Sequence, residues 1–290
     1  MISAIQLLVN GVALGFIYCL VALEYTLVFN TSGLINFGHD KYIMFGAYIF
    51  GGTFATALQL PSPLAVIFAV LTMVLLGVFI GAVAFNPLRH LPSNYAITGC
   101  LALSMLLREI ARIVYGAMPF TVPDFLMGII KIGPAPITKA SVVMILVGTL
   151  MLILQWFTMN KTKFGKGLRA VSQDAKTAPL MGINVNRMML FSTGISIGIC
   201  GLAGALLVPL YGVTLTMTTM IGTKGFVAGV VGGFGNLNGA IAGGLFVGIA
   251  EAIYSILGGP GIYRDMVSFV MMVGFLMFRP QGLLGKSQNA

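Results

Sequence analysis

Apolar segments of about 20 residues follow one another along almost the whole chain, and they limit what it can fold into. A helix needs about 20 mostly apolar residues to cross the roughly 30 Å of hydrocarbon in a bilayer. The clearest segments are Ile5–Phe29, Tyr42–Leu58, Leu64–Phe85, Ala96–Tyr115, Ala140–Phe157, Met188–Tyr211 and the shorter Met266–Phe278. We therefore expect an all-α, polytopic membrane protein in which residues 1–290 form a single transmembrane domain.

The composition excludes a water-soluble protein. Charged residues make up only 8% of the chain, against roughly 25% in soluble domains, and 58% of the residues are hydrophobic. The 38 glycines suit a helical bundle in lipid, because small residues let helix backbones approach closely where no hydrophobic effect drives packing. A bundle embedded in a membrane is the architecture that fits both observations.

A basic loop occupies residues 161–187, between two of the apolar segments. It holds six of the 16 Lys and Arg residues, and Asp174 is its one acidic residue. Because basic residues gather in the cytoplasmic loops of membrane proteins, we place this loop in the cytoplasm and not against nucleic acid.

The same loop contains the pattern of a short amphipathic helix. Leu168, Val171 and Ala175 recur at intervals of three and four residues, and charged side chains occupy the other faces. Pro179 should limit this helix, and Gly182 can end it. Such a helix can lie against lipid headgroups or dock into a groove on a partner, and its periodicity favours neither.

The segment Gly225–Leu257 is apolar, but it is too long and too rich in glycine for one simple helix. Its centre predicts a break at Gly232, Gly233, Gly235, Asn236 and Gly239. The break is either a turn at the membrane surface or a re-entrant element beside a pathway, since irregular backbone is not tolerated against lipid. An even number of crossings must separate a cytoplasmic loop from a cytoplasmic tail, which favours the turn and a total of about 8–9 helices.

Residues for covalent or metal chemistry are scarce. The chain has two histidines, His39 and His90, and its cysteines Cys19, Cys100 and Cys200 lie far apart inside apolar stretches. No nucleophile–base arrangement, metal-ligand spacing or phosphate-binding loop occurs in the sequence. We therefore expect no enzymatic activity, metal or cofactor on this chain, so any ATP would bind a partner.

Four polar residues in or beside the apolar segments are candidates for a translocation path. Glu24 and Glu251 each place a carboxyl group within a span, at a cost of roughly 2.5–3.5 kcal/mol, so they should face the bundle interior. They either contact the substrate or hydrogen-bond to neighbours for packing. Asn36 and His39, between the first two segments, either fix a broken helix near the path or cap helix ends.

Four motifs occur in order along the chain. They are Asn10-Gly11-Val12 through Gly15 and Tyr18 with Gly33-Leu34-Ile35-Asn36-Phe37-Gly38-His39, Leu168-Arg169-Ala170 through Gly182-Ile183-Asn184, Gly232-Gly233 through Gly239-Ala240 with Gly243-Gly244, and Arg279-Pro280-Gln281-Gly282-Leu283-Leu284-Gly285. Each motif is weak alone. In this order, over essentially the whole chain, they resemble the permease subunits of ATP-driven importers for branched-chain amino acids, the LivH-type family.

The resemblance implies a function and a set of partners. It implies a permease subunit, in a bacterial cytoplasmic (inner) membrane, that moves branched-chain or other hydrophobic amino acids into the cytoplasm by alternating access. Its partners would be a second permease subunit, sister or identical, two cytoplasmic ATPase subunits that bind ATP, and an external substrate-binding protein. The loop with Arg169, Ala170, Asp174 and Gly182 would couple the permease to an ATPase.

Two other functions differ from this one in their energy source. A proton-coupled secondary transporter of a small polar solute would use Glu24 or Glu251 as a proton relay and would need no ATPase. A passive channel or a structural membrane protein would show conductance, or no transport, from this chain alone. The resemblance of the coupling loop favours the ATP-driven importer.

Overall fold

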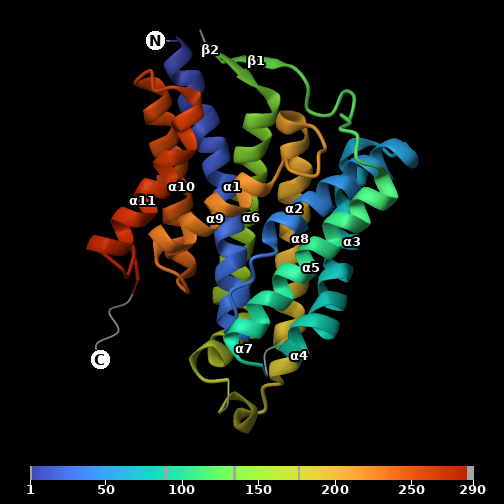
Figure 1. The fold of residues 1–290 in the computed structure, drawn as a ribbon, viewed down its shortest axis with the longest axis vertical. Coiled ribbons are helices and arrows are strands. Elements are labelled where there is room, and N and C mark those ends of the chain that lie inside the picture. Colours follow the sequence, from blue (N-terminus) through green and yellow to red (C-terminus); the bar gives the residue numbers. More distant parts are fainter. Residues whose placement is uncertain (1, 89–90, 133–134, 176, 286–290) are drawn as a thin grey trace. The chain divides into compact units, whose positions relative to one another are not determined.

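Helices make up most of the computed structural model, which describes residues 2–88, 91–132, 135–175 and 177–285 (Figure 1). In chain order the elements are α1 (Ile2–Ser32), α2 (His39–Tyr48), η1 (Ile49–Ala57), α3 (Ser62–Ile80), η2 (Gly81–Phe85), α4 (Asn86–Leu88), α5 (Ser93–Tyr115), β1 (Ile129–Ile132), β2 (Ala135–Thr138), α6 (Lys139–Lys161), α7 (Lys163–Gln173), η3 (Ala178–Met181), α8 (Val185–Tyr211), α9 (Thr219–Gly232), α10 (Leu237–Ile256), η4 (Gly261–Tyr263) and α11 (Arg264–Phe278). The two strands pair antiparallel, with Ile129 opposite Thr138 and Ile132 opposite Ala135.

Six helices within the described residues are long and apolar enough to cross a membrane. They are Ala4–Ser32, Ser62–Leu88, Lys139–Lys161, Val185–Tyr211, Leu237–Ile256 and Gly261–Phe278. The expected segments Tyr42–Leu58 and Ala96–Tyr115 are also largely helical, as α2 with η1 and as α5. The predicted all-α, polytopic fold is thus confirmed, whereas the total of 8–9 spans stays a prediction.

The chain forms two compact units. Unit 1 comprises Met1–Thr26, Pro123–Met151 and Met220–Ala290, and unit 2 comprises Leu27–Val122 and Leu152–Thr219. The helices α1 and α6 each contribute residues to both units. The prediction of one transmembrane domain over the whole chain stays a prediction.

In unit 2, α8 packs against α2 and α3 through glycines. A Cβ atom added to Gly46 of α2 would overlap the backbone of Gly201 of α8, and one added to Gly204 would overlap the carbonyl oxygen of Ile43. Small residues at these crossings let the helix backbones touch. Most of α8 is consequently buried.

In unit 1, α1 packs against α10 in the same way. A Cβ atom on Gly244 would overlap Cys19 of α1, and one on Gly248 would overlap the backbone of Gly15. The three cysteines of the chain are buried and free, as expected for small apolar side chains.

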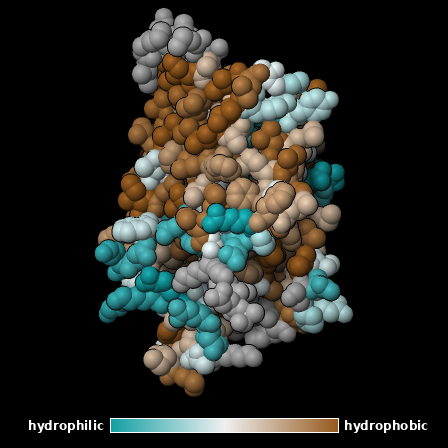
Figure 2. Space-filling view, turned by 90° about the vertical axis from the view of Figure 1, so that its left-hand side faces the viewer, coloured by the Kyte–Doolittle hydropathy of each residue, from teal (hydrophilic) through white to brown (hydrophobic). Residues whose placement is uncertain are grey.

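Figure 2 shows hydrophobic residues over much of the upper part of the view and hydrophilic residues gathered in its lower half. The exposed apolar side chains of α11 include Met266, Val270, Val273 and Met277. An apolar surface of this kind is unfavourable in water and favourable against lipid tails. It therefore agrees with a membrane location.

The glycine-rich segment breaks where the sequence predicts. Between α9 and α10, Gly233 (φ 105°) and Gly235 (φ 91°) adopt positive φ values that other residues rarely reach. At about 1.5 Å per residue, the 14 residues of α9 span about 21 Å, which is less than a full crossing. The choice between a turn at the membrane surface, which crossing parity favours, and a re-entrant element stays a prediction.

Candidate functional site

The basic loop in unit 2 contains the predicted amphipathic helix, α7. Thr162 caps this helix, because its Oγ1 accepts a hydrogen bond from the amide of Gly165 (3.1 Å). Leu168 and Val171 are buried, and Arg169 between them is exposed. The helix thus places its apolar face on the protein and its basic face outside.

The predicted end of this helix is wrong. The helix stops before Asp174, whose carboxylate accepts a hydrogen bond from the amide of Thr177 (3.3 Å), so the side chain sets a turn in place of another helical residue. Ala175, expected on the apolar face, is exposed in this turn. Pro179 lies in the first turn of η3, where proline is tolerated, and Gly182 (φ 76°) ends η3. The loop therefore presents two short helices.

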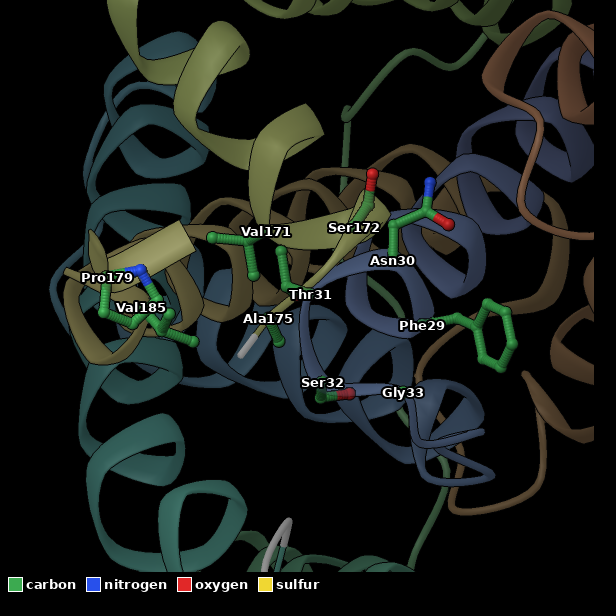
Figure 3. Close-up of a pocket in the computed structure, with 10 residues that line it drawn as sticks. All are labelled: Phe29, Asn30, Thr31, Ser32, Gly33, Val171, Ser172, Ala175, Pro179 and Val185. Carbon is green, nitrogen blue, oxygen red and sulfur yellow. The ribbon is translucent and has the colours of Figure 1, made fainter. Parts of the chain in front are cut away.

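A pocket of about 610 Å³ lies between this loop and the end of α1, within unit 2 (Figure 3). It is lined by Phe29, Asn30, Thr31, Ser32, Gly33, Val171, Ser172, Ala175, Pro179 and Val185. None of these ten residues is charged. Thr31 is fixed by a hydrogen bond of 2.7 Å between its hydroxyl group and that of Ser192 in α8. The pocket thus adjoins both the basic loop and a long buried helix.

Asn36 and His39 lie together before and at the start of α2. The Oδ1 of Asn36 accepts a hydrogen bond from the amide of Gly38 (2.9 Å). The Nδ1 of His39 is 2.9 Å from the carbonyl oxygen of Asn36, and its Nε2 is 3.4 Å from the hydroxyl group of Ser196 in α8. Both side chains are buried and hold the non-helical segment between α1 and α2. Their part in transport stays a prediction.

An ion pair follows directly after His39. The Nζ of Lys41 is 2.8 Å from Oδ2 of Asp40 and donates to the hydroxyl group of Thr219 (3.3 Å). The hydroxyl group of Thr218 donates to the carbonyl oxygen of Asp40 (2.6 Å). The pair therefore places both signs of charge beside the predicted path residue His39.

In unit 1, Glu251 is the centre of a buried charged cluster. Its carboxylate lies 2.7 Å from Nζ of Lys224 and 3.2 Å from Nε of Arg264. It also accepts hydrogen bonds from the hydroxyl groups of Tyr18 (3.2 Å) and Ser268 (2.5 Å). These contacts tie α1, α9, α10 and α11 together. Glu251 therefore has the ionic and hydrogen-bonding partners that a packing role requires.

Sequence reasoning missed the cationic partners of Glu251. Lys224 is 4% exposed and also contacts Asp265, with 2.6 Å between Nζ and Oδ1. A lysine inside an apolar segment is as costly as an acid there, and the two offset each other when paired. The unexplained lysine beside the apolar segment Gly225–Leu257 was the signal for this pair.

Glu24 is fully buried in the part of α1 that belongs to unit 1. It lies six residues after Tyr18 on the same helix, so the two residues are nearly two turns apart. Burial agrees with the expectation that its carboxyl group faces the interior of the bundle. Its role in substrate choice stays a prediction.

The glycine-rich break contacts the C-terminal motif. The amides of Leu283 and Leu284 donate to the carbonyl oxygens of Val231 (2.8 Å) and Gly232 (3.0 Å). The side-chain amide of Asn236 donates to the carbonyl oxygen of Leu284 (2.6 Å). The glycine-rich motif and the C-terminal motif are about 50 residues apart in the sequence, and these hydrogen bonds join them.

Metal-ligating side chains do not gather in the described parts of the chain. In those parts of the chain, no three His, Cys, Asp or Glu side chains come together in a way that could hold a metal ion. In the cluster around Glu251, the negative carboxylates are instead paired with positive side chains, which neutralise their charge.

Comparison with known proteins points to one family. Residues 7–276 match the family model described as "Branched-chain amino acid transport system / permease component". The chain is 31% identical to the high-affinity branched-chain amino acid transport system permease protein LivH of Escherichia coli (strain K12), over 98% of this chain and 96% of that protein. It is 30% identical to the corresponding protein BraD of Pseudomonas aeruginosa, with the same coverage.

A solved structure shares the fold. PsaBC from Streptococcus pneumoniae, in complex with Fab, aligns with a TM-score of 0.50 over 95% of this chain and 91% of that chain. The two sequences are 16% identical, so the likeness concerns the fold alone.

Proposed function

Since the chain belongs to the family of branched-chain amino acid transport system permease components, we propose that it carries branched-chain or other hydrophobic amino acids into the cytoplasm, driven by ATP. As a permease, it is a multi-pass inner-membrane protein and a translocation component, not an enzyme. The observation that carries the proposal is the similarity to two branched-chain amino acid permeases over 98% of the chain.

Permeases of this type associate with ATPase and substrate-binding components. We take the full assembly to be two permease subunits, sister or identical, two cytoplasmic ATPases and one external binding protein. This stoichiometry is part of the proposal. It places ATP on the partners and leaves this chain with no cofactor of its own.

The coupling role is assigned to the loop with Arg169, Ala170, Asp174 and Gly182. Exposed Leu180 (84%) and Met181 (82%) of η3 give the loop an apolar tip that can enter a groove on a partner. ATP would close the ATPase pair, the docked loops would move with it, and the path would switch the side to which it opens.

Reconstitution in proteoliposomes tests the proposal. The chain is combined with a second permease, the ATPases and the binding protein, and uptake of labelled leucine is followed. We expect accumulation that requires both ATP and the binding protein. Leucine uptake driven by a proton gradient without any ATPase would overturn the proposal in favour of a secondary transporter.

The substrate class is tested in the same vesicles. Isoleucine, valine and phenylalanine should compete with labelled leucine, while a charged amino acid should compete poorly. ATP-dependent uptake of another solute without leucine movement would keep the importer and overturn the assigned substrate.

A further inference from the structure

The pocket beside the coupling loop has a polar edge and an aliphatic edge. In Figure 3, Asn30 and Ser172 lie next to each other, with Phe29 beyond Asn30, and Pro179 and Val185 lie on the opposite side, with Val171 between. The hydroxyl group of Ser172 donates to the carbonyl oxygen of Arg169 (2.9 Å) and can still accept a hydrogen bond from a ligand. A ligand that fits both edges has a short polar head and a compact aliphatic tail. The volume of about 610 Å³ is within the range of small-molecule sites.

Two helix ends decide which charges the pocket favours. The last residues of α1 and of α7 line it, and the carbonyl groups at a helix C-terminus carry partial negative charge, which favours an ammonium group. Among the described residues, no basic side chain lines the pocket, but the exposed Lys163, Lys166 and Arg169 of the same loop add a positive field that favours a carboxylate. A zwitterion with an aliphatic side chain meets all of these preferences without adding net charge.

The position of the pocket connects it to coupling. Its lining comes from α7, from η3 and from the end of α1, so a bound ligand would contact the loop and the helix bundle at the same time. A ligand that binds only when these elements are together stabilises that arrangement by its differential affinity. Movement of the loop during the ATP cycle would then be opposed.

We propose that this pocket is a cytoplasmic site for a free aliphatic amino acid, which holds the coupling loop against α1 and slows import when the amino acid has accumulated. The inference rests on the proposed function, because the sidedness of the loop and its coupling role come from there. The site is separate from the predicted path residues Asn36 and His39, which are not among its lining residues.

The test uses the full assembly in vesicles whose ATPase side faces outward, with the binding protein and leucine enclosed. Leucine added outside reaches the cytoplasmic face, and ATP hydrolysis is measured against its concentration. We expect inhibition in the unaltered protein. Asn30→Ala and Ser172→Ala should each raise the half-inhibiting concentration at least about tenfold, as expected for losing one hydrogen bond to a charged group.

Gln173→Ala is the matched control. Gln173 is the exposed neighbour of Ser172 on α7 and is not among the lining residues, so its inhibition curve should equal that of the unaltered protein. Two variants from different elements keep the test valid if one of them fails to assemble.

Three outcomes would overturn the inference while leaving the proposed function intact. ATP hydrolysis that outside leucine does not slow, up to the concentration that saturates import, would show that no such site acts. If outside leucine inhibited both pocket variants as strongly as the unaltered protein, the inhibitory site would lie at the translocation path and not in this pocket. Reduced ATP hydrolysis in Ser172→Ala without any leucine dependence would assign the pocket to an ATPase side chain.

Discussion

Lys224 and Glu251 form the ion pair at the centre of the buried cluster in unit 1, and removing one partner should destabilise the fold. Glu251→Gln leaves the buried ammonium group of Lys224 with Asp265 alone, and Asp265 is 43% exposed at its side chain. Breaking a buried pair costs about 3–5 kcal/mol. We expect about 3 kcal/mol, since one partner remains, measured as unfolding in detergent.

The exposed pair on α5 supplies the control for this experiment. Arg112 and Glu109 lie 2.8 Å apart with side chains about half exposed. Arg112→Ala should change stability by less than about 1 kcal/mol. Equal effects of the two variants would contradict the structural importance of the buried cluster.

Glu24 carries a prediction about substrate choice. Its carboxyl group is fully buried in α1, where a charge is costly. Such a residue is therefore expected to serve either packing or the translocation path. We expect Glu24→Gly to change which amino acids compete for leucine uptake in proteoliposomes, with a severalfold shift in relative affinity. An unchanged competition profile, at normal assembly of the complex, would leave Glu24 with a packing role.

The sequence identified the costly acids but not their partners. Glu24 and Glu251 stand out because acids are rare in spans, and both are buried as expected. Lys224 stands out as a base beside an apolar segment, but its pairing with Glu251 joins α9 to α10, and the pattern within one helix does not identify a partner on another. The hydroxyl partners Tyr18 and Ser268 could not be predicted from the sequence either, because such residues are common in any span.

At the scale of elements, α7 allows a test of coupling. Leu168 is 2% exposed on the buried face of this helix, so Leu168→Asp would place a charge there and detach the helix. We expect ATP-dependent leucine uptake to fall at least tenfold while the variant still assembles in the membrane. Uptake is measured in proteoliposomes and assembly by size-exclusion chromatography.

Leu168→Met is the matched control, because it keeps the apolar volume. It should retain uptake close to that of the unaltered protein. If Leu168→Asp also transported normally, the position of α7 would have no part in coupling.

Hydropathy predicted most of the helices. Where a predicted helix end was wrong, a local hydrogen bond was the reason. Long apolar segments became helices, because backbone groups in lipid must be satisfied within the chain. The end of α7 was misplaced since Asp174 captures a nearby amide, a contact that competes with the helix at a strength that periodicity does not reveal. The break after Gly232 was found because glycine and asparagine mark it directly.

For the whole molecule, element lengths predict the membrane side of each loop. α10 has 20 residues, about 30 Å, and Gly261–Phe278 has 18, so each can cross the bilayer. The break and the C-terminal motif are hydrogen-bonded to each other, which places both on one side and the loop before α11 on the other. With the basic loop and the C-terminal tail both predicted to be cytoplasmic, we expect residues 212–232 to bring the chain back to that side, although α9 is too short to cross alone.

Cysteine labelling checks this arrangement. Leu180→Cys and Asn238→Cys, both at exposed positions, should react with an impermeant thiol reagent only from the cytoplasmic side. Gly261→Cys, where an added Cβ meets nothing within 4 Å, should react only from outside. The native cysteines are buried and give a low background. If Asn238→Cys reacted from outside, the chain after α8 would not return to the cytoplasm, α10 and α11 would be inverted, and the parity on which the cytoplasmic tail depends would be wrong.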